Sequence, residues 1–84
     1  MNFPVYRRYN GIDTFFRIDS PDSFLELKIM GSMYQLNHFF ANNFLDRVFI
    51  SDMISLDQDR WLDLSAQDFD EQLEFCKSTK VLFP

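Results

Sequence analysis

The sequence predicts an α+β domain in which a small antiparallel β-sheet of two hairpins, arranged like a meander, packs against one C-terminal α-helix. Asn10-Gly11 and Gly31-Ser32 each separate two segments with alternating apolar residues, which is the pattern of a β-hairpin. A helical spacing of apolar residues follows Ser65. The 84 residues suffice for a single domain. We divide it into a mainly β part (1–56), an acidic connection (57–64), a helix (65–79) and an apolar tail (80–84).

The first hairpin is predicted by Asn10-Gly11, because a type I′ turn needs a positive φ at both central residues and these two residue types adopt it readily. A two-residue turn fixes the pairing of the strands and places Val5 opposite Phe16. One face of this hairpin is apolar and is the expected core side: it carries Phe3, Val5, Tyr9, Ile12, Phe16 and Ile18. The other face mixes aromatic and charged side chains, namely Tyr6, Arg8, Asp13, Phe15 and Arg17.

A second hairpin is predicted between residues 25–30 and 33–39, because Gly31 can supply the positive φ of a type II′ turn. The implied cross-strand pairs are Leu27 with Leu36, Ile29 with Tyr34, Leu25 with His38, Phe24 with Phe39, Lys28 with Gln35, and Glu26 with Asn37. Ser20-Pro21-Asp22 is also typical of a helix start, so residues 21–30 fit either a strand or a helix. Because the apolar residues alternate with period two, we expect a helical turn at 20–22 followed by a strand.

The middle of the chain is ambiguous between strand and helix. Asn42-Asn43 indicates a turn, and residues 47–54 could follow it as a fifth strand. Val48, Ile50 and Ile54 alternate as in a strand. The set Leu45, Val48, Phe49, Met53 and Leu56 fits a helical stripe about as well, so both interpretations stay open.

The C-terminal helix is predicted by several local signals that agree. Ser65 is placed as the N-cap, Asp68 completes a capping box, and Leu64 can pack on Phe69 as a hydrophobic staple. The expected buried stripe is Phe69, Leu73 and Cys76. Acidic residues gather in the first turns and lysines in the last turn, as the helix dipole favours. The apolar tail that follows either folds back onto the sheet or is offered to a partner.

Composition restricts the functions that the chain can perform. The net charge of −5 is regional, since residues 57–74 hold seven acidic residues against Arg60 alone. Such a field repels phosphate backbones and favours basic partners. The single cysteine, Cys76, excludes an intramolecular disulfide and fits a reducing compartment. With no apolar run of signal-peptide or transmembrane length, we expect a cytoplasmic protein with no membrane partner.

Catalytic chemistry is not predicted. His38 is the chain's one histidine and therefore the one candidate for a general base near neutral pH, and its predicted position beside Leu25 suits a sheet-edge histidine. Cys76 lies in the last turn of its helix, where the helix dipole disfavours a thiolate. We therefore assign no catalytic residue and no cofactor.

A metal site is not predicted either. The spacing of the acidic residues from Asp57 to Asp68 is similar to that of a calcium-binding loop. However, Leu62 stands where that loop requires glycine, and Trp61 stands where it requires an oxygen ligand. We interpret this stretch as a solvated acidic connection anchored by its tryptophan.

Two surfaces remain as candidates for binding. The aromatic and basic one comprises Tyr6, Arg8, Phe15 and Arg17. The acidic one comprises Asp57, Asp59, Asp63 and Asp70. The first is similar to faces that stack unpaired bases, but the acidity of the protein disfavours nucleic acid.

The aromatic share of 18% is high for so small a core, and exposed apolar patches mark contact sites. We therefore predict a non-enzymatic protein-interaction or regulatory module that self-associates or binds a protein partner through aromatic surface. The alternative hypothesis is an acidic inhibitor, a nucleic-acid mimic that binds a basic surface of another protein.

Overall fold

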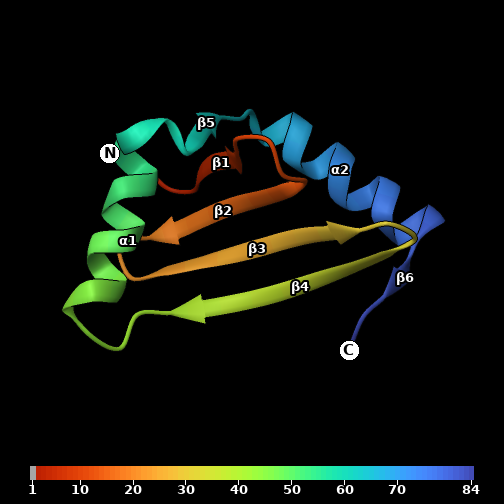
Figure 1. Ribbon diagram of the computed structural model, residues 1–84, viewed down its shortest axis with the longest axis horizontal. Helices are drawn as coiled ribbons and strands as arrows, with labels where there is room; N and C mark the ends of the chain where they lie inside the picture. Colours follow the sequence, from red (N-terminus) through yellow and green to blue (C-terminus); the bar gives the residue numbers. More distant parts are fainter. Residues whose placement is uncertain (1) are drawn as a thin grey trace.

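The computed structural model describes residues 2–84, except for the side chain of Gln58. Within this range one six-stranded sheet has the order β5-β1-β2-β3-β4-β6, and two helices pack against it (Figure 1). The elements are β1 (Val5–Tyr9), β2 (Thr14–Ser20), β3 (Ser23–Met30), β4 (Met33–Phe40), α1 (Phe44–Ser55), a 3₁₀ turn η1 (Asp57–Asp59), β5 (Trp61–Asp63), α2 (Ala66–Thr79) and β6 (Val81–Leu82). Neighbouring strands are antiparallel except β4 and β6, which are parallel. The α+β class is confirmed, but the sheet is mixed rather than purely antiparallel.

The first hairpin forms, but its predicted register is wrong by two residues. Val5 lies opposite Ile18 instead of Phe16, and residues 10–13 form the loop. Gly11 takes a positive φ of 81°, whereas Asn10 does not and instead donates its backbone N–H to the carbonyl of Arg60 over 2.7 Å. This long-range bond replaces the local type I′ turn. Because the shift is even, every residue stays on its predicted face of the sheet.

The second hairpin is confirmed pair by pair. All six predicted cross-strand pairs are present, and Gly31 has the expected positive φ of 60°. The helical turn expected at 20–22 is wrong, since Ser20 pairs with Ser23 across a tight turn between β2 and β3. The Ser20 hydroxyl accepts a hydrogen bond from the backbone N–H of Asp22, as it would at a helix start, but here the bond closes a turn.

Residues 47–54 are helical and do not form the fifth strand that the sequence left open. Asn43 caps α1 by accepting a hydrogen bond from the N–H of Asp46 over 2.9 Å. The carboxylate of Asp46 accepts in turn from the N–H of Asn42. The turn predicted at Asn42-Asn43 is therefore a helix cap, and the reciprocal bonds explain why the chain turns into a helix immediately after β4.

The C-terminal helix begins as predicted. The Ser65 hydroxyl accepts the N–H of Asp68 over 3.0 Å, and both Phe69 and Cys76 are buried. The connection at 57–64 contains a strand that was not predicted, because Trp61 to Asp63 form β5 and pair with β1. Of the two fates considered for the apolar tail, the structure shows the first: β6 folds back and pairs with the start of β4.

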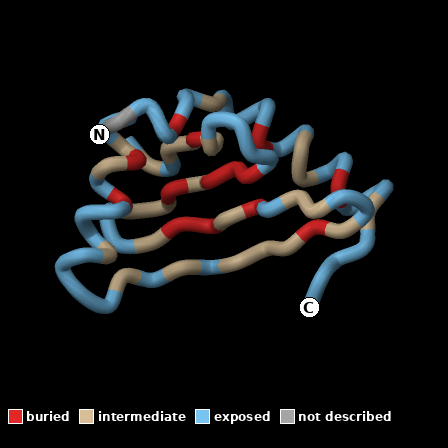
Figure 2. The backbone as a smooth tube through the Cα atoms, in the orientation of Figure 1, coloured by how far each residue is buried: buried red, intermediate tan, exposed pale blue. Residues whose placement is uncertain are grey.

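The sheet carries an apolar cluster on each face because successive residues of a strand point to opposite sides. On one face Phe15 and Leu27 pack with Phe69 and Cys76 of α2. On the other face Phe16 packs with the buried residues of α1. Both faces of the sheet are thus core, and Figure 2 shows the buried residues concentrated in β2 and β3 at its centre. The interpretation that one face of the first hairpin is the core side holds only in part.

Arg7 holds the end of α1 to the sheet. It lies on the apolar face of β1 but was absent from the residues that the sequence indicated as core, and it is buried. Its guanidinium donates to the carbonyls of Met53 and Ile54 over 2.9 and 2.7 Å and to the carboxylate of Asp63 over 2.9 Å. The last carbonyls of a helix lack a partner in the regular intrahelical pattern. Arg7 donates to two of them from a strand, and the Met53 carbonyl also accepts the backbone N–H of Leu56 over 3.3 Å.

Candidate interaction surfaces

The helix α1 has two apolar faces and buries only one of them. Ile50 and Met53 are fully buried against the sheet. On the other side the first two turns expose large apolar side chains. We call this the α1 surface; it consists of Phe44, Leu45, Val48 and Phe49. Phe40, at the end of β4, is also exposed, but its side chain lies beside His38 on the opposite face of the sheet. A helix with apolar residues around most of its circumference is typical of one that is covered on both sides.

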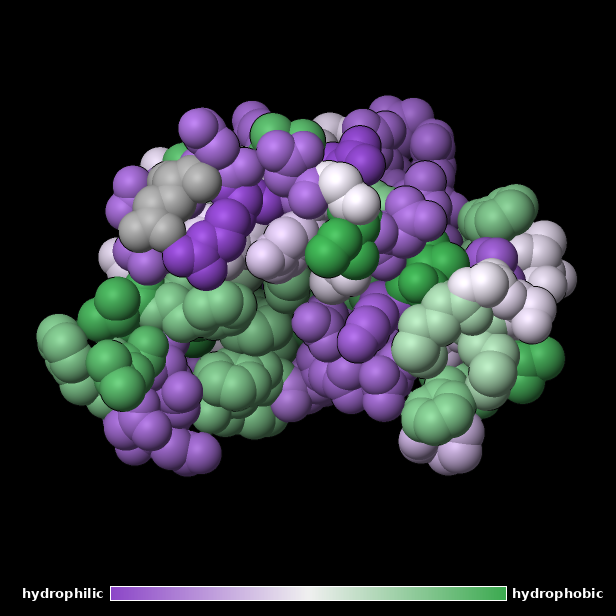
Figure 3. Space-filling view, viewed as in Figure 1, coloured by the Kyte–Doolittle hydropathy of each residue, from purple (hydrophilic) through white to green (hydrophobic). Residues whose placement is uncertain are grey.

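The α1 surface is large for a protein of this size. Phe44 and Leu45 are each 75% exposed, and Val48 and Phe49 are each 37% exposed. Together the four side chains leave on the order of 400 Å² in contact with solvent, if each presents about 150–250 Å² when free. The largest patch on a typical monomer is about 300–600 Å² and is often functional. Figure 3 shows these apolar side chains gathered over α1 at the lower left.

A second exposed apolar group lies at the other end of the same side of the molecule. Val81, Leu82 and Phe83, which we call the tail cluster, are 65, 52 and 44% exposed although β6 pairs with β4. In Figure 3 the tail cluster and the α1 surface occupy the two lower corners, with polar side chains between them. The sequence indicated the tail as a contact segment, but not its placement relative to α1.

The four residues of the predicted aromatic and basic surface share one face of the sheet, but α2 covers part of that face. Phe15 is only 5% exposed, and the ring of Tyr6 lies 5.5 Å from that of Phe69. Arg17 bonds to the carboxylate of Asp19 over 2.8 Å. In a single copy the four side chains therefore do not form one continuous exposed surface.

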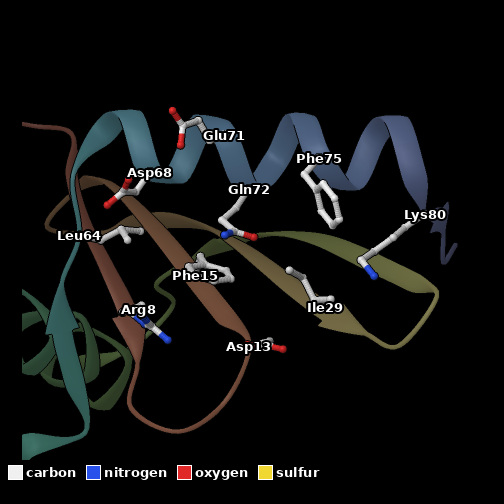
Figure 4. A pocket seen from close by; sticks show the side chains of 10 residues that line it. All are labelled: Arg8, Asp13, Phe15, Ile29, Leu64, Asp68, Glu71, Gln72, Phe75 and Lys80. Atoms are coloured by element: carbon white, nitrogen blue, oxygen red, sulfur yellow. The ribbon is translucent and has the colours of Figure 1, made fainter.

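Arg8 lines a solvent-open pocket of about 350 Å³ between α2 and the sheet (Figure 4). Gln72 and Phe75 point from α2 toward the floor, which Phe15 and Ile29 form. The rim carries both signs of charge, from Arg8, Asp13, Asp68, Glu71 and Lys80. Small-molecule sites are mostly apolar with few polar groups, so this mixed rim favours no single class of ligand.

The four residues of the predicted acidic surface are all exposed. Asp57 and Asp59 lie in η1, Asp63 ends β5, and Asp70 lies in the second turn of α2. Asp63 also has a structural role, because it forms the ion pair with Arg7 described above. Asp57, Asp59 and Asp63 therefore lie along the edge of the sheet opposite β4, and Asp70 lies near the start of α2, which runs from β5 to β6 (Figure 1).

The two candidate chemical residues lie in different surroundings. His38 is exposed on β4, with its ring 6.1 Å from that of Phe40. Cys76 is fully buried on the inner face of α2. Burial raises the pKa of its thiol, and the positive charge of nearby Lys80 partly offsets this rise. A thiol in this position is the small buried hydrophobe that the sequence indicated.

The described residues hold neither a metal-ligand cluster nor a membrane-spanning helix. Among residues 2–84, His, Cys, Asp and Glu side chains do not gather in groups of three or more that could hold a metal ion. The two helices of this range are too short or too polar to cross a membrane.

Compared with protein-family models, with curated proteins and with solved structures, the chain shows no significant match.

Proposed function

We propose that this protein is a non-enzymatic interaction module that self-associates through the α1 surface. The observation that supports the proposal is the unused apolar face of α1, where Phe44 and Leu45 are three-quarters exposed. None of the four residues of the α1 surface is charged, and neighbouring Arg47 is paired with Asp22. Two copies, each with a net charge of −5, can approach through this surface because the acidic stretch lies at the opposite edge.

A charge at the centre of the α1 surface tests the proposal. Leu45→Glu is expected to weaken self-association at least ~10-fold, because about 1.4 kcal/mol corresponds to a factor of ten and burying an unpaired carboxylate costs several kcal/mol. The fold should be unaffected, since Leu45 is 75% exposed. Light scattering coupled to size-exclusion chromatography over a range of concentrations measures the effect.

Ala66→Glu is the matched control for this substitution. It adds the same charge at an exposed helical position in α2, away from the α1 surface. It should leave the concentration dependence of the mass unchanged. If both variants associate as the unmodified protein does, the α1 surface is not the contact.

A second function, the acidic inhibitor that binds a basic surface of a partner protein, is favoured by the continuous exposure of the acidic residues along η1, β5 and α2. Its binding would depend on charge and should collapse as ionic strength rises. Replacing Asp57, Asp59, Asp63 and Asp70 together by asparagine should abolish capture of a basic protein while leaving apolar association intact. Retained capture by this variant would reject the inhibitor.

A further inference from the structure

The outer edge of β4 is open over more than half of its length. β6 pairs only with Met33 and Tyr34, through bonds such as Phe83 N–H to the carbonyl of Tyr34 over 2.7 Å. Backbone groups alternate in direction along a strand, so those of Tyr34, Leu36, His38 and Phe40 all point away from β3. In the described part of the chain, Leu36, His38 and Phe40 have no backbone partner on that side. Three residues thus present free N–H and C=O groups in a row.

This edge lacks the features that usually prevent strands from pairing with another chain. Protected edges carry charged residues, prolines or bulges, or they are very short. The eight residues of β4 include no Asp, Glu, Lys, Arg or Pro, and their pairing with β3 is regular. The opposite edge of the sheet is β5, which has three residues and includes Asp63. The β4 edge is therefore the one suited to accept another strand.

The two exposed apolar groups lie at opposite ends of this edge. The α1 surface begins at Phe44, a short loop beyond the end of β4 at Phe40, and the tail cluster lies beside Met33, where β4 begins. When two copies of β4 run antiparallel, the end of one lies beside the start of the other. The α1 surface of each copy then lies against the tail cluster of its partner, as an isologous two-fold contact requires.

We propose that a second copy of this chain binds this edge, with β4 antiparallel to the partner's β4 and the two-fold axis at His38. The proposal rests on the self-association proposed above and specifies its geometry. With the axis at His38, Leu36 pairs with Phe40 of the partner subunit, so that all three open residues are bonded. An axis at Asn37 or Phe39 would leave either Phe40 or Leu36 without a partner.

The area of the contact supports this arrangement. A stable interface buries about 800 Å² on each partner. The α1 surface alone provides on the order of 400 Å², which is too little. The β4 edge and the tail cluster supply the remainder. One interface therefore accounts for all three otherwise unexplained features: the open edge, the second apolar face of α1 and the exposed tail.

Amide hydrogen exchange of the intact protein, followed residue by residue by NMR at low and high protein concentration, tests the geometry. The amides of Leu36, His38 and Phe40 should all exchange roughly tenfold more slowly when about nine-tenths of the chains are paired. These amides exchange only in the unpaired chains, which are then about a tenth of the total. The amides of Gln35, Asn37 and Phe39 point toward β3 and serve as internal controls, protected equally at both concentrations. Protection of all three open amides places the axis at His38, and protection of only two rejects that axis.

The outcomes separate this inference from the proposed function. If the mass rises with concentration but Leu36, His38 and Phe40 exchange equally fast at both concentrations, pairing of the β4 edges is rejected while association through α1 stands. If the protein stays monomeric at both concentrations, self-association and edge pairing are rejected together.

Discussion

Replacing Phe69 by alanine is expected to lower the free energy of unfolding by about 3–5 kcal/mol. Phe69 is fully buried in α2 and packs into the cluster that contains Phe15 and Leu27, with its ring 5.5 Å from that of Tyr6. Truncation removes the ring and leaves a cavity that a six-stranded sheet cannot collapse to fill. Small domains are stable by only about 5–15 kcal/mol, so the loss is a large fraction of the total.

Urea unfolding followed by circular dichroism measures this loss, and Phe75→Ala is its matched control. Phe75 lies in the same helix but is 54% exposed, so its truncation should cost less than ~1.5 kcal/mol. Equal destabilisation by the two substitutions would mean that α2 does not dock through Phe69.

Replacing Arg7 by methionine is expected to cost about 3 kcal/mol, because hydrogen bonds from a charged group are worth roughly 1.5–3 kcal/mol and several are lost together. The Ile54 carbonyl would lose its Arg7 donor at the end of α1, and the Met53 carbonyl would keep the longer bond from the Leu56 N–H. Asp63 would be left without its ion pair, but its carboxylate is 80% exposed and can be solvated by water. Methionine keeps most of the buried volume, so the loss reports mainly the hydrogen bonds.

Arg17→Met controls for the removal of an arginine from the same sheet. Arg17 is half-buried and pairs only with Asp19 two residues away, so its replacement should cost no more than ~1 kcal/mol. Urea unfolding of both variants gives the comparison. If Arg7→Met is as stable as Arg17→Met, Arg7 does not anchor α1.

The parts of the fold that depend on local chemistry could be predicted from the sequence. In the second hairpin, Gly31 and the period-two pattern of β3 agree with each other, so the register was fixed by the sequence pattern itself. The same holds for α2, where Ser65 and the buried stripe agree. Agreement between independent local signals made these predictions correct.

The parts that depend on distant contacts could not be predicted in this way. The loop of the first hairpin is set by a bond from Asn10 to Arg60, fifty residues away in sequence. The strands β5 and β6 have three and two residues, too few for a periodic pattern to appear. The helix α1 did have a local signal, the cap formed by Asn43 and Asp46, and it was missed because the two asparagines fit a turn equally well.

The binding surfaces, too, could be predicted from the sequence only in part. The sequence indicated an excess of aromatic residues. The structure places the surplus at Phe40, Phe44, Phe49, Phe75 and Phe83 rather than at Tyr6 and Phe15. The reason is that α2 covers the face of the first hairpin. The surplus could have been located from the sequence by noting that residues 44–56, taken as a helix, hold more apolar residues than one buried face can accommodate.

Sedimentation of the unmodified protein, over a concentration series at about 0.15 M and 1 M salt, tests the central claim of self-association through apolar surface most directly. We expect a mass that rises from monomer to dimer with concentration. We also expect the dimer to persist or tighten at high salt, because screening reduces repulsion between two chains of net charge −5. A protein that stays monomeric up to high micromolar concentration, or a dimer that dissociates as salt is raised, would contradict it.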